Sequence, residues 1–131
     1  MILQSGVIPY RVKNGNVEIL LITSSRGKRW IIPKGWIAPW LTSADSAAKE
    51  AWEEAGIKGS VVQPAIGVYK ILKWGCVWEV EVFSMAVETE VADYPEAERR
   101  NRQWMSVPQA RKQIREPDLK LLFEQLSQFE A

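Results

Sequence analysis

The sequence predicts an α/β protein, an α/β/α sandwich built on a curved mixed β-sheet, from three observations. Two apolar segments near the N-terminus flank Asn14-Gly15, and Asn-Gly is a strong signal for the turn of a β-hairpin. An alanine-rich segment with helical periodicity then begins near Thr42 or Ser43 and ends at Gly56. Residues 77–82 alternate apolar and polar side chains, as a half-buried strand does. A hairpin combined with such a strand excludes a purely parallel, doubly wound sheet.

The other elements follow in chain order. Pro33 ends the short third strand, and Lys34-Gly35 is expected to open a loop into the helix. The charged segment 88–102 contains Pro95 and is expected to be a loop. Strands are expected at residues 3–12, 17–23, 30–33, 61–66, 67–73, 77–87 and 103–107. Two final helices are expected at residues 108–114, beginning at a proline, and 117–129, with an apolar stripe.

Length and composition limit the possible functions. The 131 residues predict a single domain over residues 1–131. The net charge of +1 gives no overall attraction to long nucleic acid or to a membrane. Histidine is absent, which excludes Ser-His-Asp catalysis and His-ligated metal sites and favours Mg²⁺, Mn²⁺ or Ca²⁺ on oxygen ligands. The single Cys76, an N-terminus without a basic signal region and the lack of a long apolar run predict a cytoplasmic protein.

The helix over residues 43–55 has two contrasting faces. Its packing face is a narrow stripe of alanines, namely Ala44, Ala47, Ala48, Ala51 and Ala55. Glu50, Glu53 and Glu54 gather on the other side, where like charges repel and the C-terminal end of the helix dipole disfavours anions. Either these carboxylates bind a divalent cation that offsets the repulsion, or they form a solvated acidic face.

The spacing of residues 35–57 carries a resemblance to a known family. Gly35 is followed at fixed intervals by Lys49-Glu50, Glu53-Glu54 and Gly56-Ile57. This pattern resembles the Nudix box, and the segment before Gly35 and the order of strands and helices also resemble the MutT-like Nudix hydrolases. The resemblance covers nearly the whole chain and implies a Nudix fold.

The resemblance also implies an activity, which is Mg²⁺-dependent hydrolysis of a pyrophosphate bond by water, with Mn²⁺ as a possible substitute. Glu53 and Glu54 would be the main metal ligands, and the carbonyl of Gly35 a further one. Glu50 would be a ligand or the general base, so that Glu50, Glu53 and Glu54 form the catalytic set. Two positions depart from the pattern, because Leu41 stands where a Glu is expected and Lys49 replaces an Arg. In some family members another Glu from a late loop helps, and Glu96 or Glu98 is the candidate for this role here.

Basic residues close to the motif are candidates for binding the polyphosphate. The predicted substrate-binding residues are Arg26, Lys28, Arg29, Lys34 and Lys49. Arg99, Arg100 and Arg102 form a second basic group. The first group, with Ser24-Ser25, is similar to the branch that hydrolyses diadenosine polyphosphates and diphosphoinositol polyphosphates. We therefore expect a small-molecule polyphosphate substrate, with another nucleoside diphosphate derivative as a further option, and a monomer or homodimer.

Two other interpretations stay open. Leu41 and Lys49 are consistent with a catalytically weak or inactive Nudix-fold module that binds and senses a nucleotide. A structural domain with an acidic face would be unaffected by Mg²⁺. Among the seven tryptophans, Trp36, Trp40 or Trp74 is a candidate for stacking on a base, although packing in the core or an interface is the alternative role.

Overall fold

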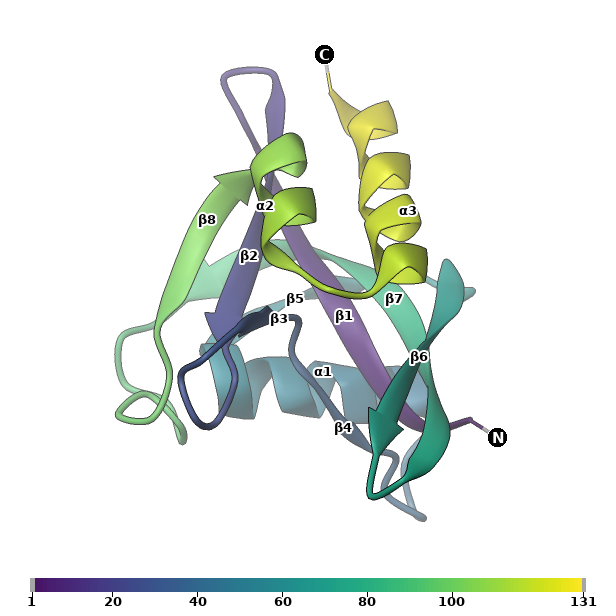
Figure 1. Ribbon diagram of the computed structural model, residues 1–131. Helices are drawn as coiled ribbons and strands as arrows, with labels where there is room; N and C mark the ends of the chain where they lie inside the picture. Colours follow the sequence, from purple (N-terminus) through teal and green to yellow (C-terminus); the bar gives the residue numbers. More distant parts are fainter. Residues whose placement is uncertain (1, 131) are drawn as a thin grey trace.

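The computed structural model describes residues 2–130, whose strands form a curved eight-stranded mixed sheet with helices on both faces (Figure 1). The long strands β1 (Ile2–Lys13) and β7 (Cys76–Glu90) run parallel and adjacent through its centre. Strand β2 (Asn16–Thr23) pairs antiparallel with β1 through the hairpin at Asn14-Gly15, where both residues have positive φ. The predicted hairpin and the mixed character of the sheet are both confirmed.

Five shorter strands complete the sheet, and each is antiparallel to the strand with which it pairs. Strands β3 (Trp30–Ile31) and β8 (Arg102–Ser106) pair with β2. Strand β4 (Lys34–Trp36) pairs with β1, while β5 (Ile57–Val61) and β6 (Gly67–Lys73) pair with β7. In the pairing order β1 and β7 lie between β4 and β6, and ring contacts of Trp36 with Trp74 and Trp78 connect β4 to the β6–β7 hairpin.

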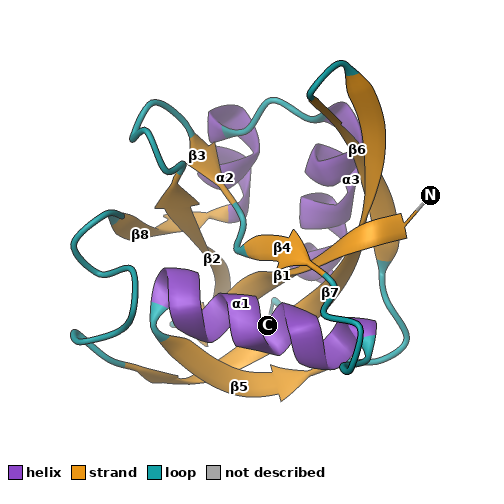
Figure 2. Ribbon diagram, turned by 90° about the horizontal axis from the view of Figure 1, so that it is seen from below, coloured by secondary structure: helices purple, strands orange, loops and turns teal. Residues whose placement is uncertain are grey.

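The helices cover the two faces of the sheet unequally. Helix α1 (Ser43–Ala55) lies across one face, and α2 (Val107–Gln113) and α3 (Pro117–Gln125) lie on the other (Figure 2). A 3₁₀ turn, η1 (Leu126–Phe129), follows α3. This arrangement confirms the expected α/β/α sandwich. Within residues 2–130, no helix is long and apolar enough to span a bilayer.

Two hydrophobic clusters hold the layers together. The cluster beneath α1 joins its buried alanines to large side chains of the sheet such as Leu20 and Phe83. The cluster beneath α2 and α3 includes the fully buried Tyr69, Leu119 and Phe123. Alanines allow α1 to approach the sheet closely, which places one edge of the helix next to β4.

Three sequence-based boundaries are wrong. Lys34 and Gly35 belong to β4 rather than to a loop, because both pair with β1. The strand expected at 61–66 lies earlier, at Ile57–Val61, since the chain enters the sheet directly after the helix ends at Gly56. The last helix keeps α geometry only to Gln125 and continues as the 3₁₀ turn.

Candidate active site

Both ends of α1 are fixed by local capping, which determines where its acidic residues lie. The Thr42 hydroxyl accepts a hydrogen bond from the Asp45 amide at 3.1 Å. Gly56 ends the helix in the left-handed region, with φ of 68°, and its amide donates to carbonyls of the last turn. Glu50 and Glu54, one turn apart, consequently lie side by side on the edge of α1 that meets β4.

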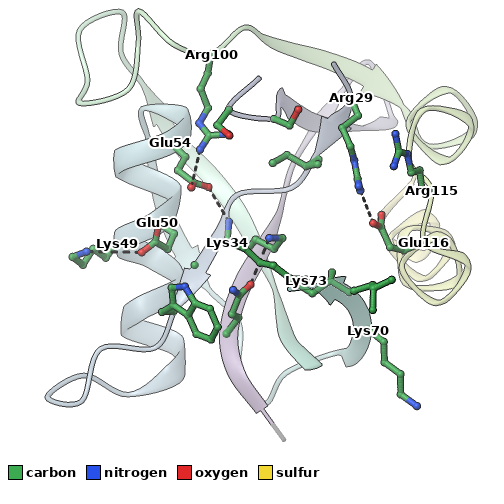
Figure 3. Close-up of a pocket in the computed structure, with 18 of the residues that line it drawn as sticks. Arg29, Lys34, Lys49, Glu50, Glu54, Lys70, Lys73, Arg100, Arg115 and Glu116 are labelled. Atoms are coloured by element: carbon green, nitrogen blue, oxygen red, sulfur yellow. Dashed lines mark hydrogen bonds and ion pairs between the residues drawn. The ribbon is translucent and has the colours of Figure 1, made fainter. Parts of the chain in front are cut away.

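A cleft of about 1050 Å³ opens between α1, β4, β6 and the segment before α3 (Figure 3). The acids Glu50 and Glu54 line one side, and a third acid, Glu116, lies on the far side. The basic residues that line the cleft are Arg29, Lys34, Lys49, Lys70, Lys73, Arg100 and Arg115. The cleft thus combines a carboxylate pair on α1 with an excess of positive charge around it, which suits a polyanionic ligand.

Glu54 is the most constrained of the acids. It is buried, its Oε1 accepts the Lys34 amide at 3.0 Å, and its Oε2 accepts Arg100 Nη2 at 3.0 Å. Burial raises the pKa of Glu54 to about 7, although Arg100 and the Lys34 amide act in the opposite direction. The backbone of β4 and a loop arginine therefore orient this carboxylate before any ligand arrives.

Glu50 lies directly against Gly35 of β4. A Cβ at residue 35 would lie 2.6 Å from Oε1 and 2.7 Å from Oε2 of Glu50, so only glycine leaves room for this carboxylate. Burial raises the pKa of Glu50, and the nearby charge of Glu53 raises it further. Lys49 Nζ is 3.8 Å from Glu50 Oε2. Glu50 and Gly35, predicted as site residues, are thus in contact at the cleft.

Glu53 has a different environment from the other two acids. Its Oε1 is 2.5 Å from Lys49 Nζ, in an ion pair whose side chains are 30% and 49% exposed. Hydrogen bonding to Glu53 is the main reason that the pKa of Lys49 is raised. The expectation that all three glutamates meet at one spot is therefore wrong for the side chains as they stand, because the exposed ammonium holds Glu53 beside the cleft.

The donor set is consistent with a hard divalent cation. The acids of α1 offer only oxygen ligands, which Mg²⁺ and Mn²⁺ prefer. Among residues 2–130, no three acidic side chains are gathered closely enough to hold a metal ion as they stand. The reason is visible in the pairs above, since Lys49 holds Glu53 and Arg100 holds Glu54. Glu50 and Glu54 are the pair that already faces the cleft.

The predicted basic residues divide into two groups. Arg29 and Lys34 line the cleft, and Arg29 Nη2 is 2.5 Å from Glu116 Oε2. Burial lowers the pKa of Lys34. Arg26 and Lys28 are exposed on the loop after β2 and lie outside the lining, although Ser24 and Ser25 of this loop contribute to it.

Other basic residues of the cleft come from distant parts of the sequence. Lys70 and Lys73 lie on β6, and Arg115 precedes α3 (Figure 3). The pairing of β6 with β7 places the first two in the lining of the cleft, and the packing of α3 brings the third opposite α1. No local motif marks them, so the sequence alone does not identify them.

Arg100 connects the loop 91–101 to the acidic helix. Its side chain is only 8% exposed and bonds Glu54, the Thr23 carbonyl at 2.9 Å, and Glu96 Oε1 at 2.8 Å. Glu96 is thereby close to the site, whereas Glu98 lies in a separate hollow beside Trp52. The structure thus brings Glu96, of the two later acids, close to Glu54.

An aromatic group forms the rim of the cleft. Trp36 lines the cleft and is stacked on Trp74 of the β6–β7 hairpin, with 5.9 Å between ring centroids and 11° between planes. Trp78 meets Trp36 edge to face at 5.3 Å, and Lys73 Nζ lies 4.9 Å from the Trp74 ring centroid. Trp36 and Trp74 are 41% and 72% exposed. These two rings are therefore rim residues rather than core residues.

Comparison with known proteins agrees with this architecture. The family described as NUDIX domain matches residues 3–125. Nudix hydrolase 4 of Arabidopsis thaliana is 31% identical over 116 residues, which cover 81% of this chain and 56% of that protein. The asymmetrical bis(5'-nucleosyl)-tetraphosphatase of Sus scrofa is 29% identical over 135 residues, covering 98% of this chain and 90% of that protein. This chain spans little more than half the length of the plant relative.

A solved structure extends the likeness to three dimensions. The Caenorhabditis elegans Ap4A hydrolase, in a binary complex, superposes with a TM-score of 0.81 and 22% sequence identity. The match covers 98% of this chain and 97% of that one. At this identity the likeness establishes a shared fold.

Proposed function

This chain belongs to the Nudix hydrolase family, as its sequence predicts, and from that premise we propose that it hydrolyses a pyrophosphate bond in a phosphorylated small molecule. The observation that carries the proposal is the cleft itself. Glu50 and Glu54 occupy one wall, and the phosphate-binding cations Arg29, Lys34 and Lys73 face the same space. A polyphosphate in this cleft would be held by the cations with one phosphorus close to the acids.

The acids of α1 have the chemistry of metal ligands and of a base. We assign Gly35, Glu50, Glu53 and Glu54 to holding Mg²⁺, with Glu53 turning from Lys49 to reach it. Bound Mg²⁺ supplies positive charge that neutralises phosphate oxygens and makes an attacking water more acidic. Glu50 is also placed to accept a proton, because its raised pKa brings it nearer to neutral pH than an ordinary glutamate.

The basic residues are assigned to the phosphate chain. Arg29 offers a planar guanidinium suited to two phosphate oxygens, while Lys34 and Lys73 act as single charges. If Lys49 moves to a phosphate of the substrate, the Glu53 carboxylate becomes free to bind Mg²⁺. Substrate binding is thereby linked to metal binding by Glu53. Arg26 and Lys28, on the exposed loop, are assigned to the outer part of the substrate.

A dinucleoside polyphosphate is the substrate class that we favour. The names of the pig tetraphosphatase and the nematode Ap4A hydrolase motivate this class, and the aromatic rim supports it. Trp36 and Trp74 present ring faces beside the phosphate-binding residues, and a nucleobase stacks on such faces. Diphosphoinositol polyphosphates and other nucleoside diphosphate derivatives are the competing classes. The cytoplasmic location and the single domain over residues 1–131 stay predictions.

A substrate panel tests the proposal. Purified protein is incubated with Mg²⁺ and with diadenosine tetraphosphate, a diphosphoinositol polyphosphate and a nucleoside diphosphate sugar, and products are separated by anion exchange. Metal-dependent cleavage of at least one compound is expected, with diadenosine tetraphosphate fastest. Absence of cleavage for every compound would overturn the proposal.

The second candidate is a module that binds a nucleotide without turnover. Two observations favour it, namely Leu41 at a position where the family has an acid and the pairing of Glu53 and Glu54 with protein cations. Calorimetric titration with a nonhydrolysable dinucleoside polyphosphate, combined with the cleavage results of the substrate panel, distinguishes the two. Tight binding without cleavage would identify the sensing module.

A further inference from the structure

Arg100 makes three contacts that together use all three nitrogen atoms of its guanidinium. Nη2 is 3.0 Å from Glu54 Oε2, Nε is 2.8 Å from Glu96 Oε1, and Nη1 donates to the Thr23 carbonyl at 2.9 Å. The Arg100 side chain is 8% exposed, and those of Glu54 and Glu96 are 11% and 19% exposed. One positive charge is thus enclosed between two carboxylates, and Arg100 and Glu54 both line the cleft.

The acceptors around Arg100 are of the kind that bind a divalent cation. Two carboxylates, on α1 and on the loop 91–101, are brought within reach of a single central charge, and their oxygens are typical ligands of Mg²⁺. Arginine keeps its charge at any pH the protein tolerates, and its planar donors match two separate carboxylates. A divalent cation placed between the same oxygens of Glu54 and Glu96 would be repelled by Arg100 at short range with little screening, because these surroundings are buried.

The loop that carries Arg100 is anchored on both sides. The Glu96 amide donates to the Glu53 carbonyl at 3.0 Å, which ties the loop to α1. The Asn101 amide donates to the Thr23 hydroxyl at 2.9 Å, and the Thr23 amide donates to the Asn101 carbonyl at 2.9 Å. Moving Arg100 away would therefore break an ordered network and leave a buried guanidinium without acceptors.

From these contacts we propose that Arg100 is a permanent internal cation that takes the place of one metal ion between Glu54 and Glu96. The inference rests on the proposed metal-dependent function. The chain then binds one divalent cation fewer than the same site would bind without Arg100. Glu96 is a positioning residue that holds Arg100, and it is neither a metal ligand nor the general base.

Counting bound Mn²⁺ tests this directly and needs no substrate. Isothermal titration calorimetry, with electron paramagnetic resonance of free Mn²⁺ as a second count, is applied to the wild type and to Arg100→Gln. Arg100→Lys retains a charge at the position. Arg99→Gln is the matched control, because Arg99 is 67% exposed and reaches Glu96 only at 3.6 Å. Circular dichroism verifies that each variant is folded.

Arg100→Gln is expected to bind one more Mn²⁺ per chain than the wild type, whereas Arg99→Gln and Arg100→Lys keep the wild-type number. An equal, nonzero number in wild type and Arg100→Gln would overturn the inference and leave the proposed function standing. No Mn²⁺ bound by either protein would overturn the inference too, and absence of cleavage in the substrate panel would then separately reject the function.

Glu96→Gln gives an independent test if Arg100→Gln does not fold. The number of Mn²⁺ bound by Glu96→Gln is expected to equal that of the wild type, because Glu96 contacts Arg100 rather than a metal. Loss of one Mn²⁺ in this variant would overturn the inference, since it would identify Glu96 as a ligand.

Discussion

The Glu50 carboxylate occupies the space where residue 35 would carry a side chain. A Cβ built on Gly35 would approach the two carboxylate oxygens to 2.6 and 2.7 Å, distances that real Cβ atoms essentially never show. The backbone of Gly35 is part of β4, paired with Ser5 of β1, so it has little freedom to retreat. The requirement for glycine here is one of space and comes from the acid on the neighbouring helix.

Gly35→Ala is therefore expected to displace Glu50. We expect Mg²⁺ affinity and the rate of hydrolysis to fall by about 10–100-fold, the range typical of changes that misorient metal ligands. Calorimetry measures the affinity, and thermal unfolding in EDTA shows whether the variant stays folded. Wild-type affinity in a folded Gly35→Ala protein would contradict the assigned role of Glu50.

Glu53→Gln separates function from stability. The side chains of the Lys49–Glu53 pair are 49% and 30% exposed, and ion pairs that solvent reaches contribute about 0.2–1 kcal/mol to the free energy of unfolding. The free energy of unfolding of the metal-free variant should thus lie within about 1 kcal/mol of the wild-type value. The rate of hydrolysis should fall by about 100-fold or more, because the charge of a metal ligand is lost. Glu98→Gln, on the exposed loop outside the cleft, is the control. Full activity in Glu53→Gln would reject Glu53 as a ligand.

The stability of the metal-free protein is expected to depend on pH through Glu54. Its pKa is raised from 4.5 to about 7 by burial, so the folded state binds more protons than the unfolded state between these values. Stability contributed by this group is therefore present at low pH and falls as pH rises from about 5 to 8, by on the order of 1–3 kcal/mol. Glu50 acts in the same direction.

Urea unfolding in EDTA at pH 5, 6, 7 and 8 measures this dependence. Glu54→Gln should flatten it, leaving the part due to Glu50, whereas the control Glu98→Gln should keep the wild-type slope. A wild-type free energy of unfolding that increases from pH 5 to pH 8 would contradict this prediction, because it would show that burial does not disfavour the ionised form of Glu54.

The sequence was sufficient for features with local signals. Thr42 and Gly56 mark the ends of α1 by their capping chemistry, and the spacing of the alanines determines which side of the helix packs. The Asn14-Gly15 turn gives the hairpin by its backbone preference. The family follows from the spacing of the glutamates along that helix.

Features that depend on long-range packing were not accessible in this way. The partner of Glu54 is Arg100, which is 46 residues away in the sequence, and no pattern around either residue pairs them. Lys73 reaches the cleft only because β6 folds back along β7. The strand at Lys34–Trp36 was missed because a three-residue strand has no periodicity to detect.

Trp36 and Trp74 provide the last prediction, which concerns the class of substrate. If their stacked rings bind a nucleobase, Trp74→Ala and Trp36→Ala should raise KM for diadenosine tetraphosphate by about 3–10-fold, as expected for loss of one aromatic contact. KM for a diphosphoinositol polyphosphate, which has no base, should stay unchanged. Trp40→Ala is the matched control, because Trp40 is 79% exposed and lies outside the lining of the cleft. An equal rise in KM for both substrates would mean that the rings support phosphate-binding residues such as Lys73, which lies beside Trp74, and do not contact a base.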